Sequence, residues 1–330
     1  MPSILLGAFV FLLLSLLAVG DELSSLILHL DRRIILPVLA LVLANYALRF
    51  GRWCYYLTAL EISVPFGENA AIFLSGLVMA ASPGKLGEVL KSYLLRLRTQ
   101  APLTKSLPAV MAERVTDVSS LVLIFLASAG AAGFGGGAAV AFGGLVVAGL
   151  WLLTRQQWIE RMLRRAEQTR FGAQAARAVA LYRGTAALLR PAPLLVGTAL
   201  GAVGWSCECT ALYVLCRALG GNLAWTPAAC AFALSTLVGA LSFLPGGLFA
   251  AEGSLAVVLL QMSQSPAVAA ATTVGIRLST LWFAVGVGAL SLFSYQRWLR
   301  AHSTATSESV LFSGAVASAA AAPGREAMPQ

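Results

Sequence analysis

Charged side chains inside apolar segments are the residues of this sequence that could do chemistry. They fall in three groups: Lys85, Glu88 and Lys91; Glu113, Arg114 and Asp117; Glu208, Glu252 and Arg277. An ionised group in an apolar environment costs several kcal/mol unless it is paired or hydrated, so each is a candidate for binding or transport. On a helix, Glu113 lies one turn from Asp117, and Glu88 lies one turn from both lysines. Each cluster is therefore predicted to face one way.

Two arginines and two turns indicate what such a site would bind. Arg114 and Arg277 come from different halves of the sequence, and each follows a turn, at Pro83-Gly84 and at Pro245-Gly246-Gly247. A guanidinium stays charged when desolvated and binds phosphate through two parallel hydrogen bonds. Glycines let the backbone approach a ligand, and the helix N-termini after the turns add partial positive charge. Together with Lys85, this pattern predicts a binding site for an anionic headgroup.

A structural interpretation of the same charges stays open. In that interpretation, Glu88 and Glu252 neutralise Arg114 and Arg277 as buried ion pairs that lock each interrupted segment to a neighbouring helix. Such pairs are compatible with a transport role, because an arginine held by a carboxylate can still face a cavity. The charges alone do not decide between these two uses.

Catalytic and metal chemistry have little support in the residue types. Neither His29 nor His302 lies in a predicted membrane span, so no triad has a positioned base. The five cysteines and these histidines lack zinc-ligand spacing, and the cysteines are interpreted as small packing residues. Glu88 with Asp117 or Glu113 would form a carboxylate pair, but the nearby cations would hold both ionised. We expect no catalytic residue, no metal and no cofactor.

The composition places the chain in a lipid bilayer. Of 330 residues, 58% are hydrophobic and 11% are charged, whereas soluble domains are about one quarter charged. So few charged residues cannot cover the surface of a water-soluble fold of this length. We predict a single integral membrane domain over residues 1–300 and a disordered Ser/Ala-rich tail over 301–330.

Eight apolar segments define the predicted fold. Six of them are predicted to cross the membrane as helices: 4–19, 34–50, 107–134, 138–154, 194–216 and 267–293. The other two, 70–95 and 230–260, are interrupted by Pro-Gly into halves too short to cross about 30 Å of hydrocarbon. We predict that they are re-entrant helical hairpins sheltered by protein or water. The predicted fold class is an all-α polytopic membrane protein with six transmembrane helices and two re-entrant helical hairpins.

The two interrupted segments resemble each other. Residues 74–82 and 234–242 share six identities in nine positions, and a Pro-Gly turn, a Glu and an Arg follow at matching distances. This similarity predicts an internal repeat with a period of about 162 residues. Repeat one covers about 34–134, and repeat two covers about 194–293.

The net charge of +9 is concentrated in one stretch. Residues 155–190 hold eight arginines and two glutamates, which is typical of a cytoplasmic connector and argues against nucleic acid as a partner. With this connector and both termini placed in the cytoplasm of a bacterial inner membrane, the first hairpin opens inward and the second outward. Inverted-topology repeats with broken helices are the architecture of secondary transporters.

The chain resembles the lysylphosphatidylglycerol synthase transmembrane family of flippase-like membrane proteins over residues 5–295. The motifs behind the resemblance are SPGKLGEVLKSYLL (82–95), AERVTDVSSLVLI (112–124) and LPGGLFAAEGSLAVVLL (244–260), the last followed by Gly275-Ile276-Arg277. The resemblance implies translocation of a charged or glycosylated lipid across a bacterial or archaeal cytoplasmic membrane. The family's polar and turn positions then fall on Pro83, Gly84, Lys85, Gly87, Glu88, Glu113, Arg114, Asp117, Pro245, Gly246, Gly247, Glu252 and Arg277.

The sequence departs from the family pattern in two ways. No soluble aminoacyl-transferase or glycosyltransferase domain follows residue 300, so the lipid-synthesising activity in the family's name is not expected here. Where the family often has an Arg-Glu pair after the second turn, this chain has Ala251-Glu252. The implied headgroup site therefore has one cation fewer.

The predicted function is that of a lipid flippase-like transporter for an anionic phospholipid or a polyprenyl-phosphate-linked lipid. The predicted binding residues are Lys85, Glu88, Lys91, Glu113, Arg114, Asp117, Glu252 and Arg277, and the hairpin turns are Pro83, Gly84, Pro245, Gly246 and Gly247. The expected partners are membrane lipids, a second copy of the chain or a lipid-synthesis enzyme.

Two alternatives to transport stay open. One is a non-transporting scaffold or accessory subunit of a lipid or glycan biosynthesis complex, which would seal Arg114 and Arg277 in salt bridges. The other is an intramembrane lipid-modifying enzyme, which would need a carboxylate without a cationic partner. A transporter instead needs the two arginines to be open to lipid or water.

Overall fold

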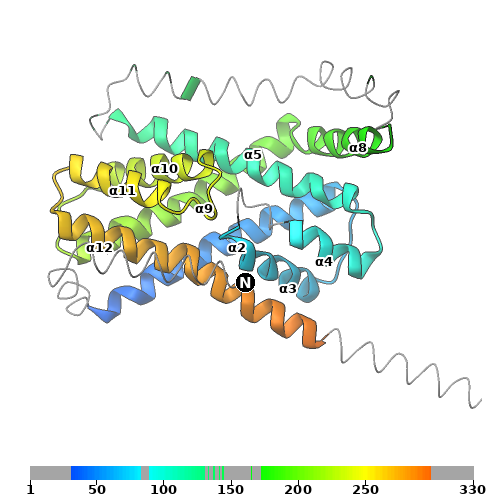
Figure 1. The fold of residues 1–330 in the computed structure, drawn as a ribbon, viewed down its shortest axis with the longest axis horizontal. Coiled ribbons are helices and arrows are strands. Elements are labelled where there is room, and N and C mark those ends of the chain that lie inside the picture. Colours follow the sequence, from blue (N-terminus) through cyan, green and yellow to red (C-terminus); the bar gives the residue numbers. More distant parts are fainter. Residues whose placement is uncertain are drawn as a thin grey trace, which may run out of the picture.

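The fold was obtained as a computed structural model, which describes residues 31–82, 89–130 and 172–298 together with a few positions between 131 and 171. In these residues the structural elements are helices, so the predicted all-α class is confirmed (Figure 1). Three helices in this part are long and apolar enough to cross a membrane: Arg32–Ala59, Pro191–Ala218 and Pro266–Trp298. They coincide with three of the six predicted spans.

Several predicted features lie outside the described residues. The predicted spans at 4–19 and, almost entirely, at 138–154 are among them, as is the tail at 301–330. The first Pro-Gly turn and the two charges after it also fall outside: Pro83, Gly84, Lys85 and Glu88. The predictions for these residues stay predictions.

The two halves of the chain have the same order of elements. The first half has a long helix, two short ones and another long one: α2 (Ile35–Ala59), α3 (Phe66–Gly76), α4 (Val89–Thr99) and α5 (Leu103–Ser128). The second half has α9 (Pro191–Ala218), α10 (Trp225–Leu241), α11 (Ala250–Gln261) and α12 (Pro266–Arg277), which continues through a π-helical turn to Trp298. This order agrees with the repeat predicted from the sequence.

The short helices form two packed pairs, the first hairpin (α3 and α4) and the second hairpin (α10 and α11). α3 packs against α4, and α10 packs against α11. At 1.5 Å per residue, the 11 residues of α3 span about 17 Å and the 17 of α10 about 26 Å, less than a bilayer core. In Figure 1 the two hairpins lie at opposite ends of the molecule, with α2 and α9 between them.

The turn of the second hairpin meets the residues that follow α3 at the centre. The backbone N–H of Gly246 donates to the carbonyl of Ser82 at 3.4 Å, and Ala81 packs with Leu248 and Leu281. A Cβ at Gly246 would lie 3.2 Å from the Cα of Ala81. The second Pro-Gly turn therefore touches the residues that directly precede the first one.

Small residues on α9 let it pack closely against α2. A Cβ at Gly197 would lie 1.9 Å from the hydroxyl oxygen of Tyr56, and a Cβ at Gly201 would lie 2.8 Å from Nη1 of Arg52. These glycines are four residues apart and face the same neighbour, which is the small-residue spacing that brings membrane helices together. The space they leave is filled by large polar side chains of α2.

The end of α2 corrects one step of the topology prediction. The predicted span ended at Phe50, but the helix runs on to Ala59. Trp53, Tyr56 and Leu57 continue its buried face, so Arg52 lies within the helix and is fully buried. Arg52 is therefore an interior charge and says nothing about which side of the membrane the helix reaches.

The end of the arginine-rich connector is a helix that packs on the core. α8 (Gly172–Leu188) lies against α5, where a Cβ at Gly184 would come within 2.6 Å of the Pro108 ring. Leu188 is buried in the same cluster as Trp53 and Ala109. The part of the predicted connector that the structure describes is thus an ordered part of the helical domain.

Candidate functional site

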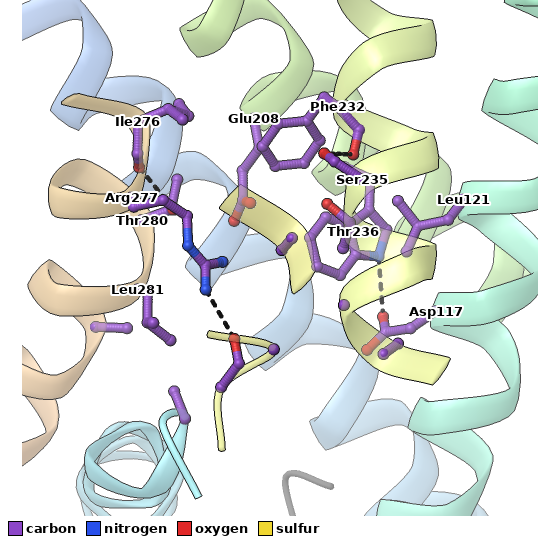
Figure 2. A pocket seen from close by; sticks show the side chains of 18 of the residues that line it. Asp117, Leu121, Glu208, Phe232, Ser235, Thr236, Ile276, Arg277, Thr280 and Leu281 are labelled. Atoms are coloured by element: carbon purple, nitrogen blue, oxygen red, sulfur yellow. Dashed lines mark hydrogen bonds between the residues drawn. The ribbon is translucent and has the colours of Figure 1, made fainter. Parts of the chain in front are cut away.

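A cavity of about 290 Å³ lies where the two halves meet (Figure 2). Its walls come mainly from α2, α5, α9, α10, α11, α12 and the turn between α10 and α11. More than half of its lining residues are glycine or have apolar side chains. The polar side chains that line it are Tyr46, Arg49, Arg114, Asp117, Trp205, Glu208, Ser235, Thr236, Arg277 and Thr280.

Arg277 fastens the second hairpin to α12. It is the last residue of α12 before the π-helical turn, and its Nε donates to Glu252 Oε1 of α11 at 2.6 Å. Its Nη2 donates to the carbonyl of Gly246 at 2.7 Å, as Figure 2 shows. The side chain keeps 17% of its surface exposed and lines the cavity. Arg277 is therefore paired and accessible at once.

The turn that receives Arg277 has an unusual backbone. Four of its residues have positive φ: Phe243, Gly246, Gly247 and Phe249. Glycine adopts this conformation at little cost, whereas a phenylalanine is strained there. A Cβ at Gly247 would also lie 3.0 Å from the Cα of Gly239 on α10. Gly247 is thus required by backbone packing within the protein as well as by its φ angle.

Asp117 of α5 organises the opposite wall. It accepts hydrogen bonds from Arg52 Nη2 at 2.6 Å and from Trp205 Nε1 at 3.2 Å. Arg114, one turn earlier on α5, pairs with its second oxygen at 3.1 Å. The Arg114 side chain keeps 23% of its surface exposed. Like Arg277, it is paired with a carboxylate and still lines the cavity.

Arg52 ties three helices together beneath this wall. From α2 it reaches Asp117 and the Thr116 hydroxyl of α5, and the Gly197 carbonyl of α9 lies 3.4 Å from its Nη1. Its full burial is tolerated because the Asp117 carboxylate neutralises it and hydrogen bonds satisfy its Nη groups. Sequence reasoning missed Arg52 as a site residue. The signal was the apolar spacing of Trp53, Tyr56 and Leu57, which continues the helix beyond Phe50.

Glu208 of α9 faces the cavity from a third side. Figure 2 shows its side chain pointing into the same space as that of Arg277. Tyr46 and Arg49 of α2 lie on this side too, and the Tyr46 hydroxyl donates to the Thr280 carbonyl at 3.0 Å. Among the described lining residues, Arg49, Arg114 and Arg277 stand against Asp117 and Glu208. The lining has a formal net charge of +1.

Lys91 and Glu113 form a separate pair away from the cavity. The Lys91 Nζ lies 2.5 Å from Glu113 Oε2, and the two side chains are only 3% and 1% exposed. The ammonium also sits over the rings of Trp53 and Phe73, at 4.6 Å and 5.2 Å from their centroids. Neither residue is among those that line the cavity. The pair fastens the first hairpin to α5.

The structure therefore sorts the predicted binding residues. It brings Arg114, Asp117 and Arg277 to one cavity, where Gly246 and Gly247 also line the wall. Glu252 pairs with Arg277, which lines that cavity. Glu113 and Asp117 were predicted to face one way, but they pair with different helices: Glu113 with α4 and Asp117 with α2. The predicted Glu252–Arg277 pair is confirmed; Lys85 and Glu88 lie outside the described residues.

Comparisons with known proteins agree with the motifs. The sequence model of the family described as the lysylphosphatidylglycerol synthase TM region matches residues 3–288. The UPF0104 membrane protein of Methanothermobacter thermautotrophicus is 35% identical over 102 residues, which cover 30% of this chain and 30% of that protein. The match to this relative thus spans less than a third of its length, while the family match covers most of the chain. The chain belongs to the lysylphosphatidylglycerol synthase transmembrane family of membrane proteins.

Proposed function

We propose that this protein moves an anionic phospholipid or a polyprenyl-phosphate-linked lipid across the cytoplasmic membrane, with the headgroup held in the cavity between the two hairpins. The observation that supports this most directly is the position of Arg114 and Arg277. One arginine comes from each half of the chain, and both line the same cavity while partly exposed.

The carboxylates beside these arginines suit reversible binding. Asp117 and Glu252 hold the two guanidinium groups in place, which lowers the free-energy cost of leaving them in a low-dielectric cavity. A phosphate presents acceptor oxygens in a geometry that a guanidinium binds as well as it binds carboxylate. A headgroup can therefore share or replace these partners, and the carboxylates take the arginines back when it leaves.

The arrangement of the two halves supports alternating access. Each half has a long helix, a short hairpin and another long helix in the same order, and the second Pro-Gly turn contacts Ala81 and Ser82 next to the cavity. In the proposed topology the repeats are inverted, both termini are cytoplasmic, and the hairpins open to opposite sides. Rocking of one half against the other would then expose the cavity to each side in turn.

Leaflet-resolved lipid movement in proteoliposomes tests the proposal. Fluorescent phosphatidylglycerol and a fluorescent polyprenyl phosphate would be followed by quenching from outside, for wild type, Arg114→Gln and Arg277→Gln. Each substitution is expected to slow movement about tenfold or more, because it removes charge-assisted hydrogen bonds to the phosphate. Arg98→Gln is the matched control, since Arg98 pairs with Glu68 away from the cavity. Equal movement in all four proteins, or none in wild type, would contradict the proposal.

Topology has its own test. Single cysteines at Arg96 and Gln261, both exposed, would be labelled from each side in a background without reactive native thiols. In the proposed inverted repeat, Arg96→Cys reacts from the cytoplasmic side and Gln261→Cys reacts from the opposite side. Labelling of both from one side would rule out hairpins that open in opposite directions.

A scaffold role is the second candidate, and the ion pairs favour it. Both cavity arginines are already partnered by carboxylates, as a scaffold that holds its helices together would require. For a scaffold, Arg277→Gln would lower thermal stability and recovery of a partner enzyme without any effect on lipid movement. The proteoliposome experiment therefore separates the two candidates.

Catalysis is the least supported of the three candidate functions. Glu113, Asp117 and Glu252 each pair with a cation, and an intramembrane enzyme would need a carboxylate that does not.

A further inference from the structure

A second and larger cavity lies outside the hairpins, between α5 and α8. It has a volume of about 490 Å³ and is separate from the headgroup cavity described above. The described residues that line it are Met111, Arg114, Val115, Ala178, Leu181, Tyr182, Thr185, Ala186, Leu189 and Arg190. Of these, only the two arginines are ionised at neutral pH.

The chemistry of this lining fits one class of ligand. Arg114 and Arg190 supply two positive charges, and no carboxylate is among the described lining residues. Most other lining side chains are apolar, so the cavity offers a charged part and a hydrophobic part side by side. An anionic lipid has this same division, with a phosphate that suits arginine and acyl chains that suit leucine and methionine.

The place of the cavity in the fold agrees with a lipid of the inner leaflet. Pro108, near the start of α5, contacts α8 at Gly184, so the cavity lies toward the end of α5 that begins at Leu103. Exposed Arg177 and Arg183 on α8 add to the basic character of this end. In the proposed topology this end faces the cytoplasm, where anionic headgroups attract such residues.

Arg114 connects the two cavities, because its side chain lines both of them. We propose that the cavity between α5 and α8 is a second binding site for anionic lipid, in which Arg190 and Arg114 bind the phosphate before it passes to the central cavity. The proposal of binding at this site depends only on the lining residues. The proposal of transfer to the central cavity also depends on the proposed transport function.

Photolabelling tests the binding. The full-length protein in nanodiscs would be irradiated with phosphatidic acid that has a diazirine in its acyl chain, and adducts would be mapped after non-tryptic digestion, so that loss of an arginine does not alter the peptides. We expect adducts within 111–115 and 178–189. Arg190→Gln should reduce the α8 adducts about tenfold, which corresponds to the loss of one charge-assisted contact.

Matched controls make the labelling specific. Arg98→Gln makes the same substitution on α4, outside both cavities, and should leave labelling unchanged. Ala178→Phe fills the cavity and should reduce labelling without removing a charge. Excess inorganic phosphate should not compete, because it lacks the acyl chains. Equal α8 labelling in wild type and Arg190→Gln, or equally strong labelling by a phosphatidylcholine probe, would overturn the second site.

Lipid movement distinguishes failure of this site from failure of transport. At a low mole fraction of anionic lipid, Arg190→Gln should slow movement several-fold, and a high mole fraction should restore the wild-type rate. Arg277→Gln should stay slow at both. Labelled α8 without any movement would refute transport and leave the second binding site intact. Wild-type movement without α8 labelling would refute the second site alone.

Discussion

The two ion pairs that fasten the hairpins are alike in chemistry and different in surroundings. Lys91 and Glu113 hold the first hairpin to α5, and both are almost fully buried, with the ammonium over aromatic rings. Arg277 and Glu252 hold the second hairpin to α12, and the arginine opens onto the central cavity. Both are charged pairs inside an apolar domain, but only the second can meet a ligand.

This difference shows that an intramembrane charge alone does not identify a binding site. The cost of burying a charge predicts that each one has a partner, and both pairs satisfy that requirement. What separates them is solvent-accessible space beside the pair. The lysine pair has packed aromatic side chains there, and the arginine pair has a cavity and a turn with unusual backbone angles.

The largest stability effect is expected where the pair is most buried. Lys91→Met leaves Glu113 charged and almost completely buried, so the free energy of unfolding should fall by about 3–5 kcal/mol. Lys91→Met combined with Glu113→Leu should recover most of that loss, because no charge then remains unpaired. Thermal unfolding in detergent would measure both. If Lys91→Met alone lowered the free energy of unfolding as little as the double substitution does, the pair would have to be hydrated.

The turn beside the open pair should be nearly as sensitive. Gly247→Ala places a Cβ at positive φ and within 3.0 Å of the Gly239 backbone, so we expect a loss of about 2 kcal/mol or more. Gly253→Ala, on α11 with no atom within 4 Å of the new Cβ, should be neutral or stabilising by up to about 1 kcal/mol. If the two variants unfold alike, the turn is not held against α10.

The open pair itself should matter less for stability than for binding. Arg277→Gln is expected to lower the free energy of unfolding by only about 1–2 kcal/mol, because a glutamine amide can still donate to Glu252 and the site is partly hydrated. Anionic lipid should raise the melting temperature of wild type more than that of this variant, because only wild type has both arginines of the central cavity. If Arg277→Gln lowered the free energy of unfolding as much as Lys91→Met, the two pairs would not differ in their contribution to stability.

The smallest effect is expected outside both pairs. Arg98 of α4 donates to Glu68 of α3, and its side chain is 45% exposed. Solvent screens such a pair, so Arg98→Gln should change neither the melting temperature nor lipid movement measurably. A clear change in either would show that the open end of the first hairpin takes part in function.

Much of the fold followed from patterns that are local in sequence. The Pro-Gly interruptions predicted two pairs of short helices, and α10 and α11 occupy the second of these segments. The similarity of the two segments was visible in the sequence because each has a Pro-Gly turn followed by a Glu and an Arg. The predicted span ended too early at Phe50, because the burial of Arg52 depends on glycines of α9 that are far away in sequence.

The candidate site was only partly predictable for the same reason. Glu113 and Asp117 are one turn apart, and helical spacing places them on similar faces. Their partners come from different helices: Glu113 pairs with Lys91 of α4, and Asp117 with Arg52 of α2. Spacing within one helix cannot say which neighbouring helix supplies the countercharge.

The sequence by itself determined that this is a membrane protein, where its main helices lie and which charges must find partners. Those properties depend on composition, hydrophobic length and turn residues, which act locally. Only the tertiary structure decided that Arg114 and Arg277 share one cavity, that Lys91 and Glu113 are sealed, and that Arg114 also lines a second cavity. Cavities exist between elements, so their lining depends on how distant helices pack.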